Sequence, residues 1–276
     1  MRLRLPLAMV ACLMPLVLTV ACGDDDAPAT ASEGPGSGSS SSVVKGTGTP
    51  ADAGDHTTAP VLAAPASKYS VLLADVGQGF LTDIPGTFVL DAKTYGKTPA
   101  FGSPAEGEAT LKQWGYLGGY ETGLIPEGRD PAILNGAFSV HVEIHLFKTV
   151  EGAKASYDYF QKKITGNGKA QPLNTSPVGN DSAAWKTVLG VIRNSTVNQA
   201  IHQIVFRRGT MVAIIATTGA EPFMRVESAL EFANLIDRKA LGQVPTVEPT
   251  PTSNYTPPAY SPTAARTAAA SPTKPR

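Results

Sequence analysis

The clearest pattern of hydrophobic and polar positions lies at residues 138–147, where the two kinds of side chain alternate strictly. The apolar positions fall on one side of an extended chain: Phe138, Val140, Val142, Ile144 and Leu146. Between them stand Ser139, His141, Glu143 and His145. A period of two residues predicts a β-strand with one face in a hydrophobic core and the other face polar.

Two segments show the helical period instead. After Thr149, a typical N-cap, apolar residues recur at helical spacing to Ile164, and glycines then end the segment. A second helix is predicted with Pro222 in its first turn and one apolar stripe, and it ends before Gly242. The stripe consists of Phe223, Val226, Leu230, Ala233 and Ile236.

Shorter patterns predict the remaining strands and helices. Strands are predicted at 183–190, 201–208 and 210–217, and the last two form an antiparallel hairpin around Arg208-Gly209. Shorter elements are expected earlier in the chain: a helix at 69–76, a strand at 87–90, a helical turn at 104–113 and an extended segment at 114–120.

The order strand, strand, helix occurs twice. Strands with one polar face favour an antiparallel sheet backed by helices on its other face. The predicted fold class is therefore α+β, a two-layer arrangement with the helices packed on one face and built from two strand-strand-helix halves.

Composition divides the chain into four parts. Residues 1–22 have the charged start and apolar middle of a secretion signal, and 23–66 form a Gly/Ser/Ala-rich linker. Residues 67–242 suit one globular domain, and 243–276 form a Pro/Thr/Ala-rich tail. A flexible linker of 44 residues has an r.m.s. reach of about 35 to 40 Å.

Charge argues against nucleic acid as a partner. Residues 68–242 contain 17 Lys and Arg against 16 Asp and Glu, with no long basic run. No cofactor is expected either, because Gly77-Gln78-Gly79 lacks the third glycine and the preceding strand of a dinucleotide-binding loop.

The segment Leu18-Thr19-Val20-Ala21-Cys22 resembles the bacterial lipoprotein signal motif, although Thr19 stands where the family usually has Leu. The resemblance implies cleavage before Cys22 and lipidation of its thiol, with diacylglycerol and palmitate, so that the protein is anchored on the extracytoplasmic face of a cell membrane. Cys12 would be discarded with the signal, so the mature chain would form no disulfide. An unmodified Cys22 thiol after ordinary signal cleavage is the alternative.

The strand-strand-helix rhythm is similar to the exported α+β modules of actinobacterial and chloroflexal lipoproteins, including Mog1/PsbP-like sheets. It also resembles the extracytoplasmic sensor domains of bacterial kinases. The resemblance rests on no diagnostic motif and implies no site residues.

His141, Glu143 and His145 form the most suggestive cluster in the sequence, because they share one side of a predicted strand. Side chains at i and i+2 lie about 7 Å apart, so they could share a metal ion only with ligands from a neighbouring strand. An ordinary solvated sheet face is the alternative.

Two further groups are candidate ligand-binding residues. Arg207 and Arg208 could clamp a carboxylate or phosphate, or lie exposed beside the hairpin turn. The aromatics Trp114, Tyr116 and Tyr120 fall on one side of the extended segment 114–120. They could line a pocket or stack on a sugar, or pack in the core.

These features favour a non-enzymatic, membrane-tethered binding or sensor-like module of the cell envelope, whose partner is an unknown small ligand or an envelope protein. No catalytic residues are assigned. A metal-assisted or hydrolytic envelope enzyme and a structural envelope component are the alternatives. A pocket lined by clustered His and acidic groups, a pocket lined by Trp and Tyr, or neither would distinguish them.

Overall fold

The computed structural model describes residues 55–98, 100–166 and 168–249. Eight strands form one antiparallel sheet in the order β1-β3-β4-β8-β7-β6-β5, and β2 also pairs with β3. The strands are β1 (Phe80–Thr82), β2 (Phe88–Leu90), β3 (Tyr116–Pro126), β4 (Phe138–Phe147), β5 (Gln171–Leu173), β6 (Asp181–Val191), β7 (Asn198–Arg208) and β8 (Met211–Ala220). The α-helices are α1 (Leu73–Val76), α2 (Ala92–Tyr95), α3 (Pro104–Trp114), α4 (Asp130–Leu134), α5 (Val150–Thr165) and α6 (Val226–Ala240), and the 3-10 helices are η1 (Ala66–Tyr69), η2 (Ile84–Gly86) and η3 (Glu221–Phe223).

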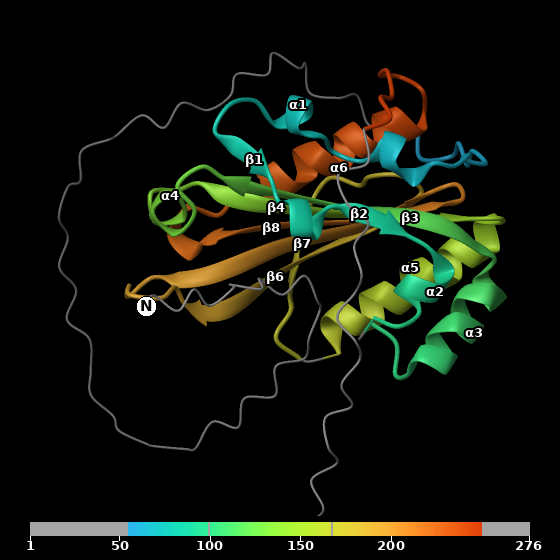
Figure 1. The fold of residues 1–276 in the computed structure, drawn as a ribbon, viewed down its shortest axis with the longest axis horizontal. Coiled ribbons are helices and arrows are strands. Elements are labelled where there is room, and N and C mark those ends of the chain that lie inside the picture. Colours follow the sequence, from blue (N-terminus) through green and yellow to red (C-terminus); the bar gives the residue numbers. More distant parts are fainter. Residues whose placement is uncertain (1–54, 99, 167, 250–276) are drawn as a thin grey trace, which may run out of the picture.

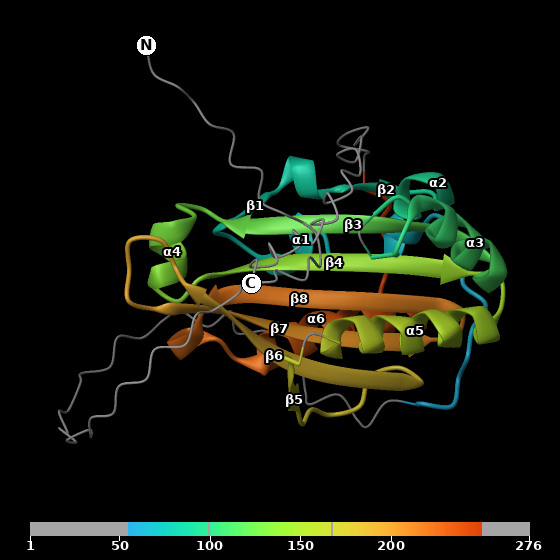
Figure 2. The same ribbon diagram turned by 90° about the horizontal axis from the view of Figure 1, so that it is seen from below.

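The centre of the sheet is the pair β4 and β8, in register from Phe138 opposite Gly219 to Leu146 opposite Met211. The predicted bounds of β4 are confirmed to the residue. The predicted hairpin is also present, since β7 and β8 pair closely up to the turn at Gly209. Figure 2 shows the long central strands lying side by side.

Helices cover both faces of this sheet (Figure 1). On one face α6 packs with η1 against the even-numbered apolar residues of β4, and on the other face α5 packs with α2 and α3. The predicted α+β class with an antiparallel sheet is confirmed, but the helices lie on two faces rather than one. The reason is that β7 and β8 carry apolar side chains on both faces, as Val212 and Ile214 face α5 while Ala213 and Ile215 face α6.

The two long helices follow from their sequences. The Thr149 side chain accepts a hydrogen bond from the Gly152 amide at 3.1 Å and so caps α5, as predicted. Gly152 is required by close packing, since a Cβ there would lie 2.0 Å from the Trp114 carbonyl oxygen. The final helix begins at Val226, later than predicted, because Pro222 belongs to η3 and Phe223 is 52% exposed there.

A β-bulge near the start of β3 changes the predicted aromatic row. The register with β4 shifts between Tyr116 and Gly118, which reverses the alternation of faces beyond it. Tyr116 therefore packs on the α5 face and Tyr120 on the α6 face, while Trp114 ends α3. The expectation that these three aromatics share one side of a strand is wrong.

Residues 55–62, within the predicted linker, pack against the domain and are called the strap below. The Thr210 amide donates to the Pro60 carbonyl at 3.1 Å, and Leu62 is buried. The strap crosses directly over Gly209, where a Cβ would lie 1.9 Å from the Pro60 oxygen. The predicted signal segment with Cys22 and the linker up to residue 54 lie outside the described residues, as does the tail from 250 onward.

No helix in the described ranges combines the length and the apolar character needed to span a bilayer.

Candidate functional site

The polar side chains of β4 lie on the face of the sheet against which α5 packs. Together with Glu121 of β3 they form the carboxylate–histidine cluster: Glu121, His141, Glu143 and His145. His145 is fully buried, and the Glu121 and Glu143 side chains are 8% and 14% exposed. His141 is the most open member at 28%. The expectation of a solvated sheet face at these positions is wrong, because Tyr95 of α2 and Phe160 of α5 pack over this side of the sheet.

Glu143 is the centre of the cluster. Its two carboxylate oxygens lie 3.3 Å from Nε2 of His141 and 3.2 Å from Nε2 of His145. A carboxylate only accepts hydrogen bonds, so both Nε2 atoms carry the donated proton. On its other side, Nδ1 of His145 lies 3.3 Å from the Tyr116 hydroxyl. A continuous polar chain thus runs from Tyr116 to His141.

Aromatic rings hold His145 in place. The Tyr95 ring of α2 stacks on the imidazole at 4.7 Å between centroids, and the Phe160 ring of α5 stacks on it at 5.5 Å. A histidine packed in this way has no open face for a substrate, so the chain reaches solvent only at its Glu143 and His141 end.

Sheet register places Glu121 directly opposite Glu143, an arrangement of like charges. Glycines stand opposite both histidines, Gly119 opposite His145 and Gly123 opposite His141. A Cβ at Gly119 would lie 2.6 Å from the Tyr116 hydroxyl. Gly119 therefore makes room for the rings of Tyr116 and His145, whereas a Cβ at Gly123 would lie 3.0 Å from the Asp83 side chain.

Burial and neighbouring charges shift the pKa values of Glu121 and Glu143 in opposite directions. Burial raises the pKa of Glu121 to about 8, with His141 acting against this shift and Glu143 adding to it. For Glu143, burial alone would raise the pKa, but hydrogen bonds from His141 and His145 hold it well below its usual range. Near neutral pH, Glu121 thus holds a proton while Glu143 is ionised.

His141 carries the balancing positive charge. Burial alone would lower its pKa, but the hydrogen bond to Glu143 and the charge of Glu121 outweigh burial and raise the pKa to about 9. One imidazolium therefore lies within 3.4 Å of two carboxyl groups.

The metal-site hypothesis at His141, Glu143 and His145 is not supported. Within the part of the chain that the structure describes, no group of three or more His, Cys, Asp or Glu could hold a metal ion. The physical reason is that the two imidazoles each bind one oxygen of Glu143, so the donors neutralise one another rather than converge on a common point.

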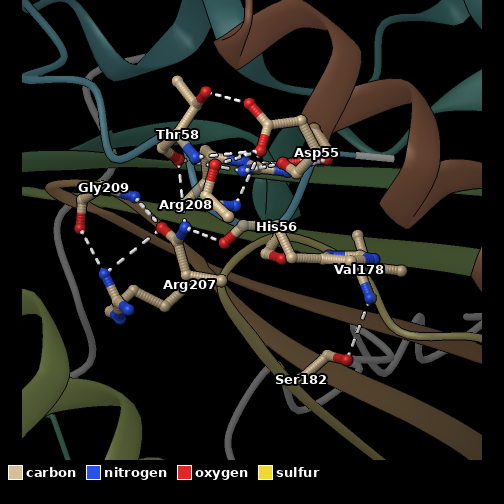
Figure 3. A network of polar contacts seen from close by, with 12 residues as sticks. Asp55, His56, Thr58, Val178, Ser182, Arg207, Arg208 and Gly209 are labelled. Atoms are coloured by element: carbon tan, nitrogen blue, oxygen red, sulfur yellow. Dashed lines mark hydrogen bonds and ion pairs between the residues drawn. The ribbon is translucent and has the colours of Figure 1, made fainter. Parts of the chain in front are cut away.

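Arg208 is the fully buried centre of a second polar group on the α6 face, the Arg208 network (Figure 3). Its Nε and Nη2 donate to the two oxygens of Asp237 at 2.6 and 2.7 Å, a bidentate pair with α6. Its Nη1 donates to the carbonyls of Asp55 and Thr58 in the strap at 2.7 and 2.9 Å.

Arg207 points to the opposite face and is also engaged. Its Nε lies 2.7 Å from an Asp181 oxygen, and its Nη1 donates to the Gly209 carbonyl at 3.2 Å. Beside it, the Asn180 side chain donates to the carbonyls of His56 and Thr58. Arg208 thus fastens the strap to α6, and Arg207 fastens β6 to the hairpin turn. The geometry does not support the carboxylate or phosphate clamp proposed for them.

Of the candidate aromatics, only Tyr120 lines a groove, called the Tyr120 groove, of about 210 Å³. Its walls are mainly apolar with three threonine side chains: Leu72, Leu73, Ala74, Thr82, Thr87, Tyr120, Thr122, Leu124 and Pro249. Trp114 packs on Phe147 and Tyr159, and Tyr116 belongs to the α5-side core. A second, more open hollow of about 380 Å³ lies along β5 and β6 beside Trp185.

Sequence reasoning missed Glu121 and Asp237. The sequence held an indication of each. Glu121 stands inside a strand with glycines two residues to either side, and Asp237 interrupts the apolar stripe of α6 next to Ile236. A charged residue at an apolar position indicates a buried partner.

No protein-family model and no curated protein matches the chain. A solved structure to which it is similar is the extracellular domain of PknH from Mycobacterium tuberculosis. The superposition has a TM-score of 0.40 at 12% sequence identity and covers 64% of this chain and 95% of that domain. A likeness of this degree carries no argument about ligand or partner.

Proposed function

We propose that the protein is a lipid-anchored, extracytoplasmic binding or sensor-like module of a bacterial envelope. The observation that carries the proposal is the layout of the sequence: an apolar segment that ends at Cys22, a Gly/Ser-rich linker and then one α+β domain. A tether of this length keeps a domain near the membrane while leaving it free to meet a partner.

The chain offers a matched control for the anchor, because Cys12 and Cys22 are its two cysteines. The wild type and Cys12→Ala should incorporate a palmitate analogue and sediment with membranes, whereas Cys22→Ala should be unlabelled and leave the membrane fraction. Labelling or membrane association that persists in Cys22→Ala would refute the lipid anchor.

For binding, the Tyr120 groove is the candidate surface. At about 210 Å³ it is smaller than the roughly 300 to 1,000 Å³ of sites for drug-sized ligands. It therefore suits one apolar side chain of a protein partner or the apolar end of a small molecule, held by contacts with Leu72, Tyr120 and Leu124.

A thermal-shift screen of the intact protein against apolar metabolites, sugars and hydrophobic peptides tests this assignment, because a ligand bound only by the folded state raises the melting temperature. Leu73→Gln, at the groove, should abolish the shift. Leu81→Gln is the control, since Leu81 is similarly exposed, at 47% against 42%, and lies outside the groove. A shift that survives Leu73→Gln would move the site elsewhere.

A further inference from the structure

We propose that the segment Ile84–Tyr95 is a proton-latched cover over the carboxylate–histidine cluster: a proton held by Glu121, opposite the ionised Glu143, keeps the cover closed, and loss of that proton lets the cover leave the sheet. The inference concerns the folded domain alone, so its test and the test of the lipid anchor succeed or fail separately.

The latch follows from the register of β3 and β4. Glu121 and Glu143 stand directly opposite each other, and His141 supplies one positive charge to the two carboxyl groups. Two ionised carboxylates on directly opposed residues repel each other strongly in a buried site, so one of them retains a proton. Oε1 of Glu121 is buried and accepts no hydrogen bond from the described residues. Its ionised form has the His141 imidazolium at 3.4 Å, but Glu143 shares that one positive charge at 3.3 Å.

Other groups that face the cluster make ionisation harder. Asp83, just before η2, adds a third negative charge that acts on Glu121 and His141. The remaining titratable neighbours are Tyr95 of α2, Tyr116 of β3, His145 of β4 and Tyr159 of α5, and none of the phenols brings a positive charge. The closed cover therefore tolerates one carboxylate and one imidazolium, but not a second carboxylate.

The cover is the weakest wall of this site. β2 contributes three residues, and Phe88 stands opposite Glu121, while α2 is a single turn whose Tyr95 stacks on His145. The Tyr95 hydroxyl is buried without a hydrogen-bond partner among the described residues, which lowers the stability of the closed form. By contrast, β4 pairs with β8 over nine residues, and nearly all of β8 is buried.

Proton linkage determines whether a rise in pH opens or closes the cover. In the closed state the pKa of Glu121 is raised to about 8, whereas in an opened, hydrated state it returns toward its ordinary value of 4.5. The open state therefore loses its proton first as pH rises. Between these two values the opening constant increases up to about tenfold for each pH unit, and it levels off above them.

Hydrogen exchange of the full-length protein, read by mass spectrometry, tests the latch. After correction for intrinsic exchange rates, the opening constant of 84–95 should rise up to about tenfold from pH 5.5 to 6.5, below the range in which His141 loses its proton. The β7 segment Asn198–Arg208 should stay protected over the same range. Glu121→Gln, which mimics the protonated acid, should abolish the rise, and Glu127→Gln, at an exposed position just past β3, should retain it.

A second variant keeps the test decisive. Phe88→Ala should raise the opening of 84–95 at every pH without changing its pH slope, because it weakens the cover and leaves the latch intact. A pH slope that persists in Glu121→Gln, a wild type without a slope, or equal opening of β7 would overturn the proposal.

Discussion

Two groups of buried charges lie on opposite faces of the same sheet, and they are built in opposite ways. Arg208 is fully buried, but four of its donor bonds are made, to Asp237 and to the strap. Glu121 is nearly as buried, yet it stands opposite another carboxyl group and leaves an oxygen without a hydrogen bond. Burial therefore does not decide whether a charge holds a fold together; the completeness of its partners does.

The largest expected effect comes from breaking the complete network. Arg208→Met should lower the free energy of unfolding by about 3 to 5 kcal/mol, because it leaves the Asp237 carboxylate buried without its partner. Urea denaturation measures this loss. The neighbouring Arg207→Met is the control, and it should cost only about 1 kcal/mol because the side chain of its partner Asp181 is 34% exposed. Equal losses in the two variants would contradict the comparison.

Removing the strap should have the next largest effect. Deletion of 23–66 takes away the carbonyls that bind Arg208 and exposes the surface under Leu62, so it should cost about 2 to 4 kcal/mol. Deletion of 23–54 removes most of the predicted linker and keeps the strap, so its stability should match the wild type. Urea midpoints that agree between the two deletions would mean that the strap is dispensable.

The carboxylate–histidine cluster should make the free energy of unfolding depend on pH. The pKa of Glu121 is raised in the folded state, to about 8, so folding binds a proton and the stability from this group falls as pH rises from about 4.5 through 8. His141 adds a fall between about 6.5 and 9. Calorimetry across pH 5 to 9 should show a decline of a few kcal/mol in the wild type.

Glu121→Gln should flatten the lower half of this decline, and Glu127→Gln should leave it unchanged. A wild-type stability that is constant or rises over this range would show that Glu121 does not hold its proton in the folded state.

The smallest effect is expected from an exposed ion pair. Lys154 and Asp158 are one turn apart on α5, 3.8 Å between charged atoms, and both side chains are about half exposed. Lys154→Gln should change the free energy of unfolding by less than about 0.5 kcal/mol, with any difference removed by 1 M salt. A cost near that of Arg208→Met would mean that the completeness of a charge's partners does not determine how much it contributes to stability.

The strands and helices that depend on local patterns could be predicted from the sequence. The alternation in β4 and the cap at Thr149 fix elements whose bounds the structure reproduces closely. The face that each element buries was harder to predict, because it depends on elements distant in sequence. The continuous apolar run of β8, Met211 to Ala216, was the available sign that both faces are covered.

The site was predicted only in part. His141, Glu143 and His145 were recognised as neighbours because a strand places them together, but their chemistry depends on Glu121, which strand order brings opposite them. The aromatic row failed because one extra residue at the bulge in β3 reverses every later side chain. Nothing in hydrophobic periodicity reports a bulge or a strand partner.

The strap also determines where mechanical force enters the domain. A pull on Asp55 is transmitted through its carbonyl to Arg208, and from there across the bidentate bridge to α6. The first bonds to be strained are therefore those between a strand end and a helix, not the ladder between β4 and β8. A domain held at this point would resist tension through Arg208 together with the bonds from Asn180 and Thr210 to the strap, and its unfolding force should depend on these bonds more than on the length of the sheet.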